Sequence, residues 1–231
     1  KLQQILLDAV LERLGRDNVL TSHHLTSWEE TANGVRATFI DKATGKPQGS
    51  YDGALLIATD GIHSAVREKL YPQEGAPIWN GRILWRGITT GDSYLSGRTM
   101  IMAGHQHVKF VCYPISQKDA NGRQQINWIA ERTLDPSYQW RREDYNRAGK
   151  LDEFLPWFKD WRFGWLDVPG LIESCSHVYE YPLVDRDPVD RWTFGRVTLM
   201  GDAAHPMYPI GSNGASQAIL DARTLAREFL S

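Results

Sequence analysis

VTLMGDAAHPMYPIGSNGASQAILDAR, at residues 197–223, is the stretch that decides the fold. Its apolar start, Val197 to Met200, predicts a short buried strand that ends at Gly201-Asp202. From Ala215 onward the apolar residues recur at helical spacing, namely Ala218, Ile219, Ala222, Leu225, Ala226 and Phe229. Ligands bind at the carboxyl ends of strands in open α/β sheets, so we expect Asp202 at a ligand site.

The loop before the predicted helix favours close approach of a ligand. The first helical amides lie near Asn213-Gly214, where no bulky side chain covers them. Unpaired N–H groups and the positive end of the helix dipole attract an anionic or electron-rich group. Pro209 stiffens the approach, Gly211 permits close contact, and Asp202 would accept hydrogen bonds from a sugar or polyol. For Asp202 alone, an ordinary loop carboxylate is the alternative.

The composition is that of a globular protein of 231 residues, with 42% hydrophobic and 23% charged residues. A net charge of −2 provides no basic field for nucleic acid or an anionic membrane. No run approaches the roughly 20 apolar residues of a membrane helix, and no signal peptide is seen. Cys112 and Cys175 are expected as buried thiols, so we predict a cytoplasmic protein. The chain starts at Lys1 and is expected to be a fragment; its oligomeric state is left open.

Two α/β segments flank a β-rich insert. Residues 1–75 contain a helix that Gly15 ends, a hairpin turn at Asn33-Gly34 and the run ALLIATDG (54–61), which is typical of a strand buried on both faces. Ser64 can cap a helix that follows. Residues 76–186 carry β-rich runs and one amphipathic helix expected over about 143–161. Residues 187–231 return to α/β pattern, so the fold class is α/β with an α+β insert.

Two motifs in register resemble those of the FAD-dependent aromatic hydroxylases, the p-hydroxybenzoate hydroxylase family. LLIATDGIHSAVR (55–67) resembles that family's Asp-Gly motif, and RVTLMGDAAHPMYPIGSNGASQAILDA (196–222) resembles its Gly-Asp motif. The further segments WRG, YPIS, INW and YPLVDRDP resemble the phenazine-1-carboxylate hydroxylase type across almost the whole chain. The resemblance implies an FAD-binding three-layer domain with an inserted β-rich substrate domain.

The resemblance also implies roles for individual residues. Gly201-Asp202 would bind the ribityl chain of FAD, with Asn213, Gly214 and Ala215 at the pyrimidine end of the isoalloxazine. Pro209 and Gly211 would lie close to the ring, and Asp60, Gly61 and Arg67 would belong to the motif that serves the pyrophosphate and NAD(P)H. Trp85 and Tyr208 are the candidate substrate contacts. NAD(P)H would reduce the flavin, and O2 would supply the oxygen atom transferred to an aromatic substrate.

The sequence departs from this family in two places. The dinucleotide fingerprint Gly-x-Gly-x-x-Gly is absent, so the FAD-binding domain is incomplete, and GSNGAS differs from the usual Gly-x-Gly-x-Asn spacing. The alternative is therefore a truncated or split relative that binds a ligand or partner without turnover. No residue is assigned as catalytic. His105 and His107 lack a Cys or carboxylate at metal spacing, which predicts no metal site.

Overall fold

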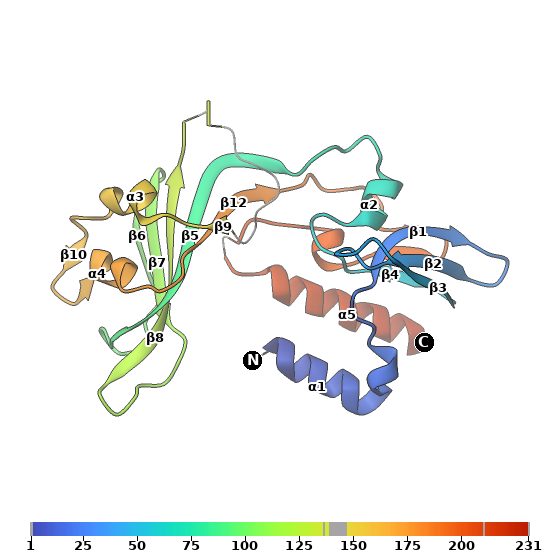
Figure 1. Ribbon diagram of the computed structural model, residues 1–231, viewed down its shortest axis with the longest axis horizontal. Helices are drawn as coiled ribbons and strands as arrows, with labels where there is room; N and C mark the ends of the chain where they lie inside the picture. The colour runs from blue at the N-terminus through green and yellow to red at the C-terminus, as the bar shows by residue number, and fades with distance from the viewer. Residues whose placement is uncertain (1, 136, 139–146, 210, 231) are drawn as a thin grey trace. The chain divides into compact units, whose positions relative to one another are not determined.

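The computed structural model describes residues 2–135, 137–138, 147–209 and 211–230 (Figure 1). The chain forms two compact units, Lys1–Pro77 with Arg186–Ser231, and Ile78–Asp185. The second unit is thus an insert within the first, which is the α/β architecture with a β-rich insert. What each unit binds stays a prediction, as do the sequence-based domain limits of 1–75, 76–186 and 187–231.

The first unit combines two small sheets with helices. One sheet is antiparallel, in the order β1 (His24–Glu30), β2 (Val35–Ile40), β3 (Pro47–Gly53). The other has the order β13 (Thr193–Phe194), β14 (Val197–Leu199), β4 (Leu56–Ala58). The remaining elements are α1 (Leu2–Leu14), η1 (Arg16–Asn18), α2 (Ala65–Leu70), η3 (Gly201–Ala203) and α5 (Gly214–Leu230). The buried core consists of Val35, Ala58, Val66, Val197, Leu199, Ala203 and Ala204.

Strands β14 and β4 run parallel and fix the site. Val197 pairs with Leu56 and Leu199 with Ala58, so the two strands end at the same edge. The segments after them, which begin at Met200 and Thr59, therefore emerge side by side. Because Asp60 and Asp202 lie in those segments, the parallel pairing brings together two motifs that are about 140 residues apart in the sequence.

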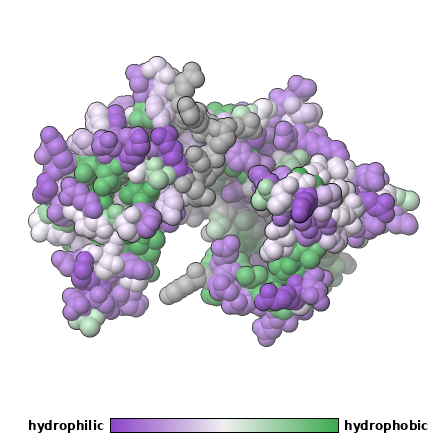
Figure 2. All heavy atoms as spheres, in the orientation of Figure 1, coloured by the Kyte–Doolittle hydropathy of each residue, from purple (hydrophilic) through white to green (hydrophobic). Residues whose placement is uncertain are grey.

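Most local predictions for the first unit are confirmed. The helix ends before Gly15, the Asn33-Gly34 turn joins β1 to β2, and Ser64 caps α2 through its Oγ, which accepts from the Arg67 amide at 3.0 Å. The prediction that the 54–61 strand is buried on both faces is wrong for the described chain, because Ile57 of β4 is exposed. Figure 2 shows further apolar surface where α1 and α5 lie, and neither helix has a buried residue.

The second unit is built on a six-stranded sheet of antiparallel pairs. The strand order is β6 (Ile101–Gly104), β7 (Val108–Pro114), β8 (Arg123–Thr133), β5 (Ile78–Asp92), β12 (Tyr179–Asp185), β9 (Arg147–Ala148). A two-stranded ribbon pairs β10 (Arg162–Phe163) with β11 (Leu166–Asp167). The described part of this unit also contains the short helices α3 (Leu151–Phe154), η2 (Leu155–Trp157) and α4 (Val168–Glu173).

One face of this sheet is covered and the other is open. Alternate residues of β5 are buried, among them Ile83, Trp85 and Thr89, and Figure 1 shows α3 and α4 on the same side of the sheet. Trp85 stacks on Phe154 of α3 with ring centroids 4.8 Å apart. Residues between these buried positions, such as Arg86 and Ile88, are exposed. The sheet therefore has an apolar core on one face and solvent access on the other.

The helix expected over 143–161 is wrong for most of its length. Residues 147–148 form a strand, only Leu151–Phe154 is α-helical, and η2 follows; residues 143–146 lie outside the described chain. Pro156 explains the early end, because its ring clashes with the helix and it has no N–H to donate. Phe154 and Phe158 are fully buried, so the apolar pattern marked the core correctly but not the helix.

Phe154→Ala tests this core. The side chain is fully buried against Trp85, so we expect a loss of roughly 3 to 5 kcal/mol in the free energy of unfolding, measured by denaturant titration. Phe163→Ala is the matched control, since Phe163 is exposed, and it should cost much less. Equal losses for the two variants would contradict the proposed packing of α3.

Candidate functional site

Asp202 and the start of α5 lie together, as the sequence predicts. Gly201 has φ +59°, a left-handed conformation that glycine adopts without strain, and this turns the chain sharply after β14. Asp202 follows and is exposed, with no hydrogen bond to the residues that the structure describes. A Cβ placed on Gly214 would lie 3.9 Å from Asp202 Oδ1. The carboxylate therefore stands beside the first residue of α5 with its oxygens available.

The start of α5 offers unused amides. The Gln217 amide donates to the Asn213 carbonyl at 2.9 Å, which is the first bond of the helix. Within the described chain, no acceptor meets the amides of Ala215 and Ser216. Gly211 has φ +89°, and the Ser212 amide donates to the Pro209 carbonyl, so a tight turn leads into the helix. Helix N–H groups that point outward make this end suited to an electron-rich group.

A histidine–aspartate pair that sequence reasoning missed holds this region. His205 Nε2 lies 2.6 Å from Asp221 Oδ2, and the same oxygen accepts from the Gly201 amide at 2.9 Å. Asp221 lies on α5, so the pair ties the helix to the turn that carries Asp202. His205 Nδ1 is buried without a partner in the described part of the chain. In the sequence, Asp221 falls on the same predicted helical face as Ala218 and Ala222. An acidic residue on that apolar face was the signal that could have identified the pair.

Asp60 and Gly61 lie at the end of β4 and lead into α2. Asp60 Oδ2 accepts from the Ala65 amide at 2.8 Å, and Gly61 has φ +81°. Asp60 also lines a cavity of about 440 Å³ in this unit, together with Lys42 and His63 among others. The Asp-Gly pair thus orders the helix start and borders an open space, and its contact with a cofactor stays a prediction.

Arg67 is a buried connector between the two motifs. Its Nε donates to Glu74 Oε2 at 2.9 Å, and Nη2 donates to the same carboxylate and to the Asp187 carbonyl at 2.8 Å. Nη1 donates to the carbonyls of Ala203 at 3.2 Å and Ala204 at 2.8 Å. All donors of the guanidinium are therefore engaged within the protein. This leaves none for a pyrophosphate, so Arg67 positions the motif rather than contacting a ligand.

The two candidate substrate contacts differ in placement. Trp85 is 3% exposed, stacks on Phe154 and donates from Nε1 to Glu180 Oε2 at 3.1 Å. Burial raises the pKa of this Glu180 carboxyl. Trp85 is therefore a core residue, and its neighbour Arg86 is the one on the open face of the sheet. Tyr208 is half-buried in the loop after η3.

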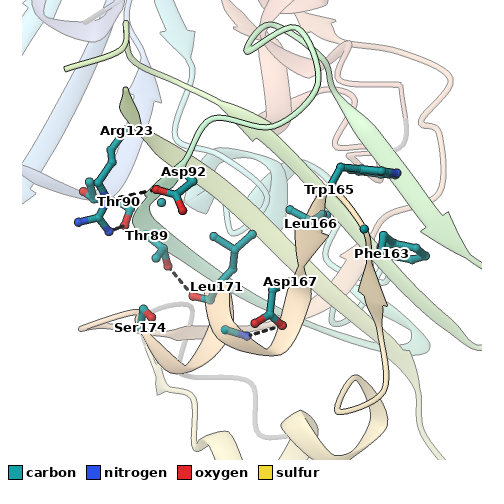
Figure 3. A pocket seen from close by; sticks show the side chains of 13 residues that line it. Thr89, Thr90, Asp92, Arg123, Phe163, Trp165, Leu166, Asp167, Leu171 and Ser174 are labelled. Carbon is teal, nitrogen blue, oxygen red and sulfur yellow. Dashed lines mark hydrogen bonds and ion pairs between the residues drawn. The ribbon is translucent and has the colours of Figure 1, made fainter. Parts of the chain in front are cut away.

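A second cavity, of about 460 Å³, lies in the insert beside β10, β11 and α4 (Figure 3). Its polar side chains serve the fold. Thr89 Oγ1 donates to the Leu171 carbonyl at 2.7 Å, Asp167 Oδ1 accepts from the Gly170 amide at 3.2 Å, and Arg123 donates to the Thr90 carbonyl. We therefore regard this cavity as a product of the packing of α4 against β5.

No group of three or more His, Cys, Asp or Glu side chains within the described ranges could hold a metal ion. None of the helices among these residues is long and apolar enough to cross a bilayer.

Comparison with known proteins places the site in context. Residues 178–231 match a family model described as an FAD binding domain. Phenazine 1,6-dicarboxylic acid hydroxylase PhzS of Lysobacter antibioticus is 45% identical over 99% of this chain and 57% of its own length. A salicylate hydroxylase substrate complex has a TM-score of 0.72 at 26% identity, over 96% of this chain and 55% of that one. Klebsiella pneumoniae HpxO, complexed with FAD and uric acid, has a TM-score of 0.69 at 28% identity, over 93% and 51%.

The chain spans about half the length of these relatives. The match nevertheless covers nearly all of this chain, across both units. The shared arrangement therefore includes the β-rich insert as well as the segment that carries Asp202.

Arg67→Met tests the connector. Removing a buried guanidinium leaves three carbonyls and part of the Glu74 carboxylate without donors, so we expect a loss of about 3 kcal/mol in the free energy of unfolding. The control is Arg36→Gln, which removes an exposed ion pair with Asp52 and should have no measurable effect. Similar stability of the two variants in denaturant titrations would rule out Arg67 as the connector.

Proposed function

Because this chain belongs to the FAD-dependent aromatic hydroxylase family, we propose that it is part of a flavin monooxygenase. The enzyme hydroxylates a planar aromatic substrate and uses NAD(P)H and O2. The observation that carries this proposal is the Asp202 carboxylate, which has no hydrogen bond within the described ranges and lies beside the start of α5, after the end of β14. A need for NAD(P)H also favours a cytoplasmic location.

The residues present fit FAD. Asp202 has both carboxylate oxygens available to accept from the hydroxyl groups of a ribityl chain. The amides of Ala215 and Ser216 donate toward an electron-rich ring edge, and the helix dipole stabilises negative charge at that edge. Gly214 provides no side chain that would block the approach. When bound, FAD supplies the redox chemistry, and the protein supplies binding, orientation and electrostatics.

Arg67 and Asp221, which belong to the two motifs, hold the turn that carries Asp202 in place. Arg67 holds the carbonyls of Ala203 and Ala204, and Asp221 holds the Gly201 amide, so the turn that carries Asp202 is fixed from two sides. A preorganised acceptor requires no rearrangement when the ligand arrives. We assign no general acid or base among these residues.

The substrate class follows from the relatives. PhzS of Lysobacter antibioticus is named for phenazine 1,6-dicarboxylic acid, and the structural neighbours include a salicylate hydroxylase. We propose that this chain also handles a planar aromatic compound, with a phenazine as the first candidate. A non-catalytic relative that binds ligand without turnover is the competing hypothesis; the similar proteins are named as hydroxylases and monooxygenases, which favours the enzyme.

Asp202→Ala tests the cofactor site in the protein expressed with a complete FAD-binding domain. Loss of a charge-assisted hydrogen bond should weaken FAD binding by about 1.5 to 3 kcal/mol, or roughly 10- to 150-fold in Kd, measured by flavin fluorescence titration. Asp190→Ala, at an exposed acid of the same unit, should leave the Kd unchanged. An unaltered Kd for Asp202→Ala would remove this residue from the site.

Gly214→Val tests the approach to the helix start. A Cβ at Gly214 meets no atom closer than 3.9 Å, so the fold should accept the change while the ligand path narrows. We expect reduced flavin occupancy and a shifted flavin reduction potential, with little change in Tm. Gly164→Val in the insert, where a Cβ meets nothing within 4 Å, should leave all three unchanged. A lower Tm with normal occupancy and potential would assign Gly214 to packing instead.

A further inference from the structure

Asp221 places a carboxylate on α5, close to the turn that follows β14. Seven residues separate it from Gly214, the first residue of the helix, which corresponds to about 10 Å along the helix axis. Its Oδ2 accepts from the Gly201 amide at 2.9 Å and lies 2.6 Å from His205 Nε2. Two donors that converge on one oxygen require an acceptor there, so this side chain is an ionised carboxylate. A negative charge therefore lies near the start of α5.

Arginine and lysine side chains do not balance this charge. Within the described residues, none of them forms an ion pair with Asp221. Arg67 reaches the same turn, where it donates to the Ala204 carbonyl at 2.8 Å, but its charge is already paired with Glu74. The imidazole of His205 is therefore the group in this part of the structure that could neutralise Asp221.

The surroundings of His205 favour a neutral ring. Its Nε2 carries the proton that Asp221 accepts, and its Nδ1 is buried without a hydrogen-bond partner in the described part of the chain. On a neutral ring Nδ1 is only an acceptor, whereas on an imidazolium it would be a buried N–H without an acceptor, which is costly. Trp192 packs against the ring with centroids 5.0 Å apart, and its indole nitrogen is a donor only. The pair of His205 and Asp221 therefore keeps a net negative charge.

This charge acts against the dipole at the start of α5. The open amides of Ala215 and Ser216 attract negative charge on a ligand, whereas the Asp221 carboxylate repels it. The ring of oxidised flavin is neutral, and reduction adds electrons to it, so the repulsion falls on the reduced form. One unit charge at about 10 Å changes such an equilibrium by roughly 3- to 15-fold at the permittivity found near protein surfaces.

We propose that Asp221 is a positioning residue that lowers the affinity of the site for reduced flavin relative to oxidised flavin, and so lowers the reduction potential of the bound cofactor. The inference rests on the proposed function and deepens it, because it assigns the redox balance of the site to a side chain behind the ligand. Asp221 holds the Gly201 amide, and its charge, which His205 leaves unneutralised, opposes the helix dipole. Two opposing electrostatic contributions from one helix thus set the potential.

The test uses protein expressed with a complete FAD-binding domain. The Kd of oxidised FAD is measured by fluorescence titration, and the reduction potential of the bound flavin by equilibration with a reference dye without oxygen; together they give the Kd of the reduced form. Asp221→Asn keeps an oxygen for both donors but removes the charge. We expect the reduced form to gain roughly 3- to 15-fold in affinity relative to the oxidised form, seen as a higher potential. Asp221→Leu also removes the acceptor and should weaken the binding of both forms by a similar factor.

Three further variants separate charge from structure. His205→Gln keeps an N–H donor for Asp221 and should leave the ratio of the two Kd values unchanged, because a neutral group replaces a neutral ring. Glu228→Gln is the matched control, since it removes an exposed acid of the same helix about 20 Å from Gly214, and it should also leave the ratio unchanged. Gln217→Glu adds a charge to the exposed side of α5 and leaves the pair intact, so the ratio should shift in the opposite direction even if Asp221→Asn does not fold.

Three results would overturn the inference. These are an unchanged ratio in a folded Asp221→Asn protein, an unchanged ratio in Gln217→Glu, or a lower potential in His205→Gln, which would show that the imidazole neutralises the carboxylate. Each of them, in protein that holds flavin, contradicts the inference and leaves the proposed function intact. Wild-type protein that binds flavin in neither redox state contradicts both. Variants that shift the ratio as expected, in protein that hydroxylates no aromatic compound, contradict the monooxygenase proposal alone.

Discussion

The first unit depends on the buried guanidinium of Arg67. A charge removed from water is tolerated when its donors are all satisfied, and here a carboxylate and three carbonyls satisfy them. Glu74 is itself held by Arg186, whose Nη1 lies 3.0 Å from Glu74 Oε2. These hydrogen bonds and ion pairs can all form only when the segments around residues 67, 74, 187 and 204 are held in one arrangement. That arrangement sets the turn on which Asp202 stands.

Sequence reasoning succeeded where structure is decided locally. The strand at 197–199, the turn at Gly201 and the helix that begins at Gly214 follow one another, and each has a local signature in apolar spacing or glycine. Contacts between distant segments left no such signature. The donors of Arg67 reach carbonyls more than 130 residues away, and the bond from the Gly201 amide to Asp221 requires the position of α5. Both were found only from the structure.

The sequence was also insufficient to place the candidate substrate contact Trp85, for a different reason. WRG lies in a strand, where successive side chains point to opposite faces, so Trp85 and Arg86 lie on opposite faces of the sheet. The sequence alone does not show which of these faces is covered by the core. The packing of Phe154 decides it, because that ring covers Trp85 and leaves Arg86 exposed. Phe154 belongs to a segment that was expected to be a long helix, and Pro156 ended that helix early. The apolar pattern marked Phe154 as a core residue, but nothing in the sequence shows that its ring lies over Trp85.

The two units differ in the polar groups that they present to solvent. The first offers a carboxylate beside open helix amides, which suits a ligand with both hydroxyl groups and an electron-rich ring. The second offers donors alone at Arg86 and Asn127, beside an aromatic and an aliphatic side chain.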